Sequence, residues 1–254
     1  MKSPLKAKPL RNPGQHLDEE IDRVTNDQLI AYFLAPAFLS LMAAMEWMAI
    51  WFRLPRQPWV YTGMAVAALV AWYLYFRRVR VRLRALKLGR DSERVVGQFL
   101  DGLRESGARI FHDVPGDNFN VDHVVICQKG IFAIETKTWS KRGKNSTISV
   151  RDGRVRRDGF PVERNPISQV EAIAGWLKGV LQESTGKLLP VKPVLLFPGW
   201  FVEPLDADMK ERLWMLEPKA LPAWIDQEPA QLSDSDVALA AFHLSRYVRT
   251  VQAE

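Results

Sequence analysis

The sequence predicts an α/β domain that follows two apolar helices. Residues 29–52 and 59–76 are apolar runs that together contain a single charged residue. Most of the 35 Lys and Arg residues come after Phe76. From Asp91 onward, short segments of helical and of strand period follow one another, which is typical of a layered α/β or α+β domain. We divide the chain into a polar arm, two apolar helices, a basic segment and a mixed domain: residues 1–28, 29–52, 59–76, 77–90 and 91–254.

The two apolar runs have the length of membrane-spanning helices. Each could cross roughly 30 Å of hydrocarbon, and the short "RLPRQP" turn between them carries two prolines that stop helices. Trp and Tyr gather near their ends, and the only charge, Glu46, lies close to the turn. The sequence therefore predicts an N-terminal transmembrane helical hairpin.

The basic run "RRVRVRLR" directly follows the second span and predicts its orientation. Basic residues beside a span stay on the cytoplasmic side, so both termini are expected in the cytoplasm. We expect an integral membrane protein with two spans and the lipid bilayer as a partner. The run is read as a topological anchor rather than as a nucleic-acid site.

Composition narrows the possible functions. Cys127 is the only cysteine, which excludes an internal disulfide and a zinc site built on several thiolates. The four histidines show no metal-ligand spacing. The formal net charge of +6 favours an acidic partner such as nucleic acid or anionic lipid.

The mixed domain begins with a helical pattern over residues 92–106 that ends at Gly107, followed by a strand at 108–114. Two hairpins are expected, one around "QKG" and one turning at Asp152 and Gly153. Further elements are a helix at 166–183, strands at 191–202 and 212–216, and a last helix at 234–250.

The first hairpin brings charged side chains together. If its loop is Gln128 and Lys129, Asp122 lies opposite Glu135; if it is Lys129 and Gly130, Asp122 lies opposite Lys137. Glu135 and Lys137 share a face because side chains alternate along a strand. Both registers gather Asp122, Glu135 and Lys137 into one cluster, whereas a three-residue loop would weaken the cluster.

This cluster has the chemistry of a phosphodiester-cleaving site. The carboxylates of Asp122 and Glu135 are suitable oxygen ligands for Mg²⁺ or Mn²⁺, and Lys137 can stabilise developing negative charge. By itself, an E-x-K pair is more often a surface ion pair. A basic stretch after it suits a phosphate backbone, or else anionic lipid. Its members are Lys141, Arg142, Lys144, Arg151, Arg154, Arg156 and Arg157.

The segments "DSERVVGQFLDGL", "NVDHVVICQKGIFAIETKTW", "RNPISQVEAIAGWL" and "VKPVLLFPGW" together resemble the nuclease-related domain, NERD, of the PD-(D/E)xK nuclease superfamily. The resemblance covers residues 89–221. It implies a restriction-endonuclease-like mixed sheet flanked by helices, with a divalent-metal site. The longer loop "TWSKRGKNSTIS" departs from the family pattern.

The resemblance assigns the catalytic residues. Asp122 matches the superfamily's Asp, Glu135 and Lys137 match the E-x-K pair, Glu93 matches the acidic residue of the first helix, and Gln169 matches the polar position after the N-P motif. The expected function is a membrane-anchored, metal-dependent nuclease acting on DNA. The alternatives are a catalytically silent module that tethers nucleic acid or protein to the membrane, and a scaffold for a protein partner alone.

Overall fold

The structure is a computed structural model that describes residues 10–53, 58–141, 143 and 146–251. The chain forms two compact units. One is Leu17–Leu88, and the other joins Met1–His16 to Gly89–Glu254. Most contacts of each unit are made within that unit. The long helix Pro58–Asp101 contributes residues to both units, because the division falls between Leu88 and Gly89.

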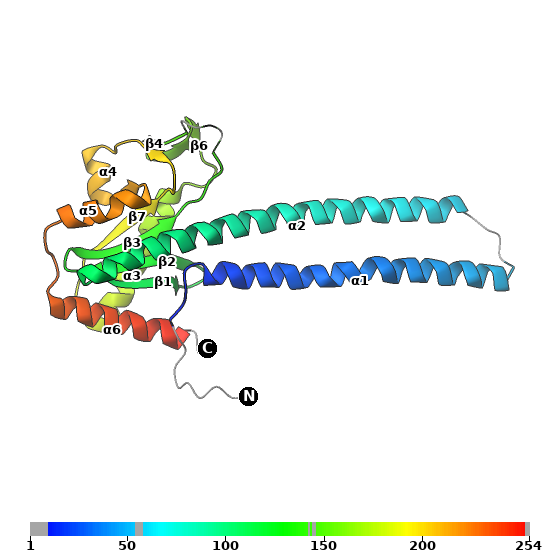
Figure 1. Ribbon diagram of the computed structural model, residues 1–254, viewed down its shortest axis with the longest axis horizontal. Helices are drawn as coiled ribbons and strands as arrows, with labels where there is room; N and C mark the ends of the chain where they lie inside the picture. Colours follow the sequence, from blue (N-terminus) through cyan, green and yellow to red (C-terminus); the bar gives the residue numbers. More distant parts are fainter. Residues whose placement is uncertain (1–9, 54–57, 142, 144–145, 252–254) are drawn as a thin grey trace. The chain divides into compact units, whose positions relative to one another are not determined.

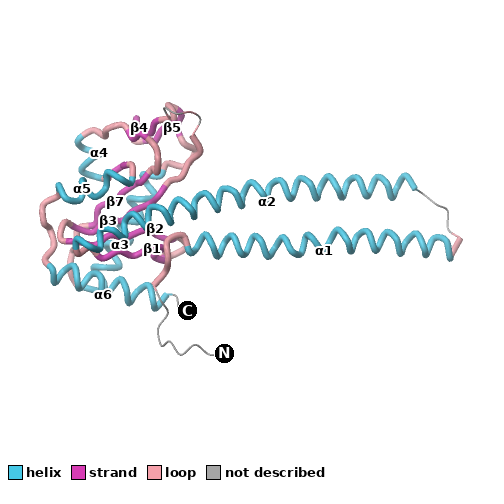
Figure 2. The backbone as a smooth tube through the Cα atoms, viewed as in Figure 1, coloured by secondary structure: helices cyan, strands magenta, loops and turns pink. Residues whose placement is uncertain are grey.

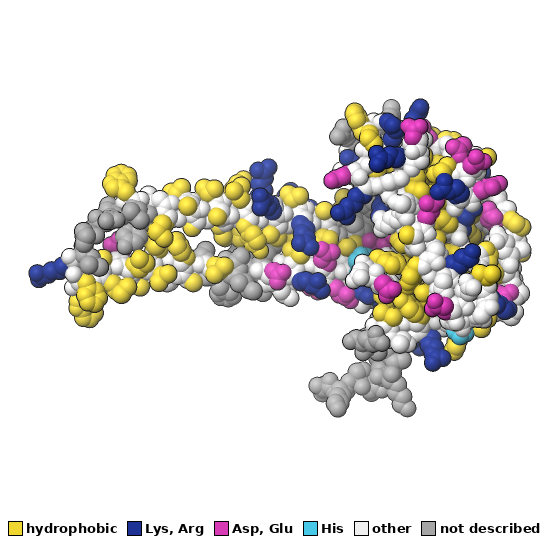
Figure 3. All heavy atoms as spheres, turned by 180° about the vertical axis from the view of Figure 1, so that it is seen from behind, with side chains coloured by type: hydrophobic (Ala, Val, Ile, Leu, Met, Phe, Trp, Pro, Cys, Tyr) yellow, Lys and Arg dark blue, Asp and Glu magenta, His cyan; other side chains and the backbone are white. Residues whose placement is uncertain are grey.

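Two antiparallel helices make the first unit, as Figures 1 and 2 show. They belong to α1 (Gln15–Trp51) and α2 (Pro58–Asp101). Contacts between them include an exposed ion pair, in which Arg82 Nη2 lies 2.6 Å from Glu20 Oε1. Phe76 is buried and lies 4.6 Å from the ring of Trp72, measured between centroids. Figure 3 shows many hydrophobic side chains exposed along these helices.

The expected transmembrane hairpin is wrong. Among the residues described, which leave out the side chains of 28–33, 35, 36, 58, 60 and 61, no helix has a stretch long and apolar enough to cross a membrane. Much of the second run is Trp, Tyr, Thr, Gly and Ala, which contribute little transfer free energy, and the first run holds Glu46 and Pro36. Two further predictions depended on these spans and are therefore also wrong. They are the two-span localisation with cytoplasmic termini, and the lipid bilayer as a partner.

The second unit contains a mixed sheet with the order β1-β2-β3-β7-β9. Strands β1, β2 and β3 are antiparallel neighbours, whereas β3, β7 and β9 run parallel to one another. Their bounds are Arg109–Pro115, Asn120–Cys127, Gly130–Thr136, Val191–Leu196 and Trp214–Leu216. The three parallel strands end in register at Thr136, Leu196 and Leu216, so their carboxyl ends form one edge.

A smaller sheet with the order β6-β5-β4-β8 follows the end of β3 along the chain. Its strands are Thr147–Arg151 (β4), Arg154–Arg157 (β5), Phe160–Pro161 (β6) and Phe201–Val202 (β8). Asp152 and Gly153 form the β4–β5 turn with φ values of 54° and 68°. This left-handed conformation is the reason for the Asp-Gly sequence there, as predicted.

Helices cover both faces of the larger sheet (Figure 1). On one face, α3 (Pro166–Thr185) and α6 (Asp234–Val251) pack against β1, β2 and β3. On the other face lie the end of α2 and α5 (Leu221–Gln227). Shorter helices complete the unit, namely η1 (Gly102–Ser106), α4 (Ala207–Arg212) and η2 (Pro218–Ala220). This mixed α/β architecture agrees with the predicted nuclease-like fold.

One predicted helix boundary is wrong. A separate helix was expected to begin at residue 92, but residues 92–101 are the last turns of the continuous α2. Most of residues 77–90 are Arg, Leu, Ala and Lys, which are good helix formers, and proline does not interrupt them. Gly107 ends this region as expected, with φ 88° and its N–H donated to Arg104 O.

Candidate active site

The β2–β3 hairpin brings Asp122 and Glu135 side by side. Cys127 pairs with Gly130 and His123 pairs with Ile134, so the register continues to Asp122 opposite Glu135. Of the two predicted registers, the one with Gln128 and Lys129 in the loop is confirmed. All seven residues of β3 are buried, and this burial holds Glu135 in place near the carboxyl end of the strand.

Glu135 is the centre of a small hydrogen-bonded group. Its Oε1 accepts from Lys137 Nζ at 2.7 Å and from Gln169 Nε2 at 2.8 Å. Gln169 Oε1 in turn accepts from Lys137 Nζ at 3.0 Å, which closes a triangle of side chains. Pro166 starts α3 at its first position and so sets Gln169 in the first turn, facing the end of β3.

Asp122 is held by the backbone of β3. Its Oδ2 accepts from the N–H of Thr136 at 2.7 Å, and the residue is only 6% exposed. Burial, followed by the negative charges of Glu135 and Glu93, raises the pKa of Asp122 well above its ordinary value. Three carboxylates therefore repel one another in a site with little water, and a cation would relieve this repulsion.

Glu93 approaches from the last turns of α2. Burial is the main cause that raises its pKa to about 7; the charge of His16 opposes this shift, and those of Asp113 and Glu135 add to it. The side chain is buried, and its Oε2 has no hydrogen-bond partner among the described residues. Glu93 thus interacts with the carboxylate cluster. A residue that only complemented a helix dipole would not need to be buried in this way.

Asp113, His16 and Arg11 lie next to this cluster, and the sequence did not point to them. Asp113 is fully buried and has a φ of 50° within β1. Its Oδ2 lies 2.8 Å from Arg11 Nε, and its Oδ1 lies 2.6 Å from His16 Nδ1. The backbone N–H of His16 also donates to Oδ2, and Asn120 Nδ2 donates to Oδ1. A single sequence could not predict this cluster. It shows neither the left-handed φ of Asp113 inside a strand nor its partners about a hundred positions away.

The residues present fit a hard divalent cation. The Oε2 atoms of Glu93 and Glu135 are buried acceptors without a donor among the described residues, and such atoms normally have a partner. Carboxylate oxygens are the ligands that Mg²⁺ and Mn²⁺ prefer. Within the described part of the chain, no three His, Cys, Asp or Glu side chains are arranged as a complete ligand set. Asp122 and Glu135 would therefore hold the ion together with water or a phosphate oxygen.

The predicted basic stretch is distributed over two segments. Lys141 precedes β4, and its Nζ lies 5.7 Å from the ring centroid of Trp200. Arg151, Arg154, Arg156 and Arg157 lie on the β4–β5 hairpin, where the guanidinium carbon of Arg157 is 5.9 Å from the ring centroid of Trp139. Arg142 and Lys144 lie outside the described residues. Figure 3 shows basic and acidic side chains interspersed on that face of the domain.

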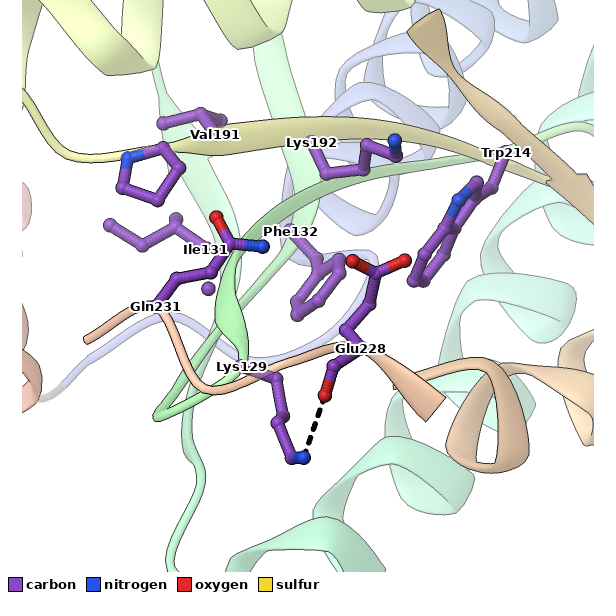
Figure 4. A pocket seen from close by; sticks show the side chains of 10 residues that line it. Lys129, Ile131, Phe132, Val191, Lys192, Trp214, Glu228 and Gln231 are labelled. Atoms are coloured by element: carbon purple, nitrogen blue, oxygen red, sulfur yellow. Dashed lines mark hydrogen bonds between the residues drawn. The ribbon is translucent and has the colours of Figure 1, made fainter. Parts of the chain in front are cut away.

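A separate small pocket of about 200 Å³ lies at the other end of β3 (Figure 4). Gly130 and Ile131 line it, whereas Glu135 and Thr136 end the same strand at the opposite edge of the sheet. Lys129 Nζ closes part of it by donating to Glu228 O at 2.6 Å, the dashed line in Figure 4. The pocket does not include the carboxylate cluster, so we place the candidate site at the carboxyl end of β3.

Comparison with known proteins identifies a family for part of the chain. Residues 88–198 match the family model described as "Nuclease-related domain", a family of the PD-(D/E)xK kind, whose members generally use divalent metals. Among solved structures, SfsA of Pyrococcus furiosus in complex with Ca²⁺ is similar at 17% identity and a TM-score of 0.22. The match covers 61% of this chain and 50% of that one, and a TM-score this low supports no inference. A search of curated proteins found no match.

Proposed function

Residues 88–198 match the model of the nuclease-related domain family, and from that match we propose that the chain is a divalent-metal-dependent nuclease that hydrolyses phosphodiester bonds of DNA. The observation that carries the proposal is the double role of Glu135. One of its carboxylate oxygens holds Lys137 and Gln169, while the other is buried and has no partner among the described side chains. A buried acceptor in that state normally has a partner such as an ordered water or an ion.

Each residue has a separate task in this proposal. Asp122 and Glu135 would hold the metal, which would polarise the phosphodiester and activate a water. Lys137 keeps its ammonium beside the reacting phosphate, where it stabilises negative charge and orients the attacking water. Gln169 is a positioning residue, because it contacts both Glu135 and Lys137 and fixes their relative place. Glu93 adds a carboxyl group whose pKa is about 7, so this group can exchange a proton with water near neutral pH.

The test compares the full chain with two variants, Glu135→Ala and Glu183→Ala. Cleavage of labelled DNA is followed with Mg²⁺, with Mn²⁺ and with a chelator. Glu135→Ala should lower the rate at least about hundredfold, because even residues that only orient a metal ligand are worth about 10–100-fold. Glu183 is exposed on α3, so its variant should cleave like wild type. Equal cleavage by all three proteins, or cleavage in the chelator, would rule out the proposal.

A second candidate is a module that binds nucleic acid without cleaving it. It is favoured by the ion pair between Lys137 and Glu135, which already neutralises one carboxylate, and by the incomplete ligand set within the described residues. Titration of Mn²⁺ distinguishes the two candidates. If Mn²⁺ does not bind while DNA binds with a steep dependence on salt, the binding module is the better description.

A further inference from the structure

A groove of about 900 Å³ opens at the same edge of the larger sheet as the candidate site. Its walls come from the segments that directly follow the three parallel strands. Lys141 and Thr147 come after β3, Gly199 to Leu205 come after β7, and Leu216 with Glu217 ends β9. Ligands of sheets with parallel strands usually bind beyond the carboxyl ends of those strands. We call this feature the aromatic groove.

A hydrogen bond connects the groove to the chain that leaves β3 at the candidate active site. Lys137 donates its backbone N–H to Leu196 O at 2.8 Å, which keeps it at the end of the sheet. Trp139, two residues later, accepts at its carbonyl from Trp200 Nε1 at 3.2 Å, and Trp200 lines the groove. A strand that left the groove along this chain would reach Lys137 and Glu135.

Aromatic rings and lysines together line the groove. Phe201 is 65% exposed, and the half-buried Trp224 carries Lys210 Nζ at 4.6 Å from its ring centroid. Lys141, Lys210 and Lys219 are all exposed, against the partly buried acids Glu203 and Glu217. Exposed aromatic rings beside ammonium groups are the pattern on which unpaired bases stack while the backbone phosphates meet cations.

We propose that the aromatic groove binds a single-stranded segment of nucleic acid and delivers it to the carboxylate cluster, so that single strands or unpaired ends are the preferred substrate. The inference rests on the proposed function for the cleavage step, but the binding step stands without it. Paired bases turn only their edges outward and cannot stack on the exposed ring of Phe201. A duplex would therefore use only the lysines of the groove.

Binding can be measured apart from cleavage. The full chain is titrated into a labelled oligothymidylate of about 15 nucleotides and into a duplex of equal length, in chelator, by fluorescence anisotropy. The single strand should bind more tightly. Phe201→Ala should weaken it at least about fivefold, which corresponds to one lost base stack. Lys210→Ala should weaken binding and reduce the slope of log K against log salt by about 0.7.

Matched controls separate these effects from loss of fold. Phe242→Ala removes an aromatic side chain that is 63% exposed on α6, and Lys178→Ala removes an exposed lysine on α3. Both variants should bind like wild type. Equal affinity for duplex and single strand, or unchanged binding by Phe201→Ala, would overturn the inference even if cleavage depended on Glu135. Single-strand binding that depends on Phe201 without any cleavage would support the groove and reject the nuclease.

Discussion

Glu93 links the charge state of the site to pH. Burial raises its pKa to about 7, so the folded protein binds a proton that the unfolded chain releases near the ordinary value of 4.5. Stability therefore decreases as pH rises from about 4.5 to about 7, because the carboxylate becomes charged while it is buried. A bound divalent cation would favour the charged form and oppose this loss.

We predict that Glu93→Gln makes the stability of the metal-free protein less dependent on pH. The shift of Glu93 corresponds to an effect on the order of 3 kcal/mol, shared with the neighbouring carboxylates. Thermal unfolding at pH 5 and at pH 7.5 measures it: the wild-type Tm should fall more between the two than that of the variant. Glu183→Gln, at an exposed position of α3, serves as the control. Parallel curves for wild type and Glu93→Gln would contradict the assignment.

Gln169 should affect the reaction more than binding. Gln169→Ala removes both hydrogen bonds that connect Glu135 and Lys137 to α3. We expect kcat to fall about 10–100-fold with little change in KM, as for residues that orient a metal ligand. Gln182→Ala, an exposed position on the same helix, should leave both constants unchanged. A change confined to KM would show that Gln169 binds substrate instead of positioning Glu135.

At the level of residues, the sequence was most informative where the alternation of side chains along a strand determines which residues share a face of the sheet. The alternation along β3 and the two possible hairpin loops were sufficient to bring Asp122, Glu135 and Lys137 together. Gln169 and Glu93 needed the resemblance, since each comes from a helix whose packing one sequence does not show. Asp113 could not be found, because its surroundings depend on a left-handed φ and on the distant His16.

At the level of elements, two glycines in helices should respond oppositely to alanine. A Cβ on Gly97, in α2, would lie 2.8 Å from Pro13 Cβ and nearer still to Cγ, so Gly97→Ala should destabilise by about 1–3 kcal/mol. Gly175, in α3, has no described atom within 4 Å of such a Cβ. Gly175→Ala should stabilise by roughly 0.5–1 kcal/mol through helix propensity. Chemical denaturation measures both; a gain at Gly97 would show that Pro13 does not pack there.

Helices were harder to delimit than strands. The strands and the helices of the mixed domain were found because turn residues separate them, as at Asp152 and Gly153. The chain from residue 77 to residue 101 lacks such signals, and good helix formers carry α2 through it. Apolar length alone also misled, since residues 29–52 and 59–76 were assigned to a bilayer by run length, while aromatic and small residues make up much of the second run.

At the level of the whole molecule, the ends of one unit are far apart in sequence. Met1–His16 belongs with Gly89–Glu254, and its contacts there include the ion cluster at Asp113 and the packing of Pro13 against Gly97. Burial opposes the charge of His16, but the hydrogen bond and charge of Asp113 outweigh it and raise the His16 pKa above 6.5. The stabilisation by protonated His16 is therefore complete below pH 6.5 and is lost as pH rises through the higher pKa of the folded state.

We expect Arg11→Ala to destabilise this unit by about 1.5–3 kcal/mol, because it removes one charged partner of the fully buried Asp113 carboxylate while His16 and Asn120 remain. The matched control is Arg212→Ala, whose ion pair with Glu171 is exposed and should be worth under about 1 kcal/mol. Proteolysis of β1 under native conditions reports the unit directly and avoids assuming one cooperative transition for the whole chain. Equal protection in both variants would mean that the N-terminal segment lies on the domain without holding it together. Strong loss in Arg11→Ala would show that residues 88–198, which match the family model, need a residue that lies almost eighty positions before their start.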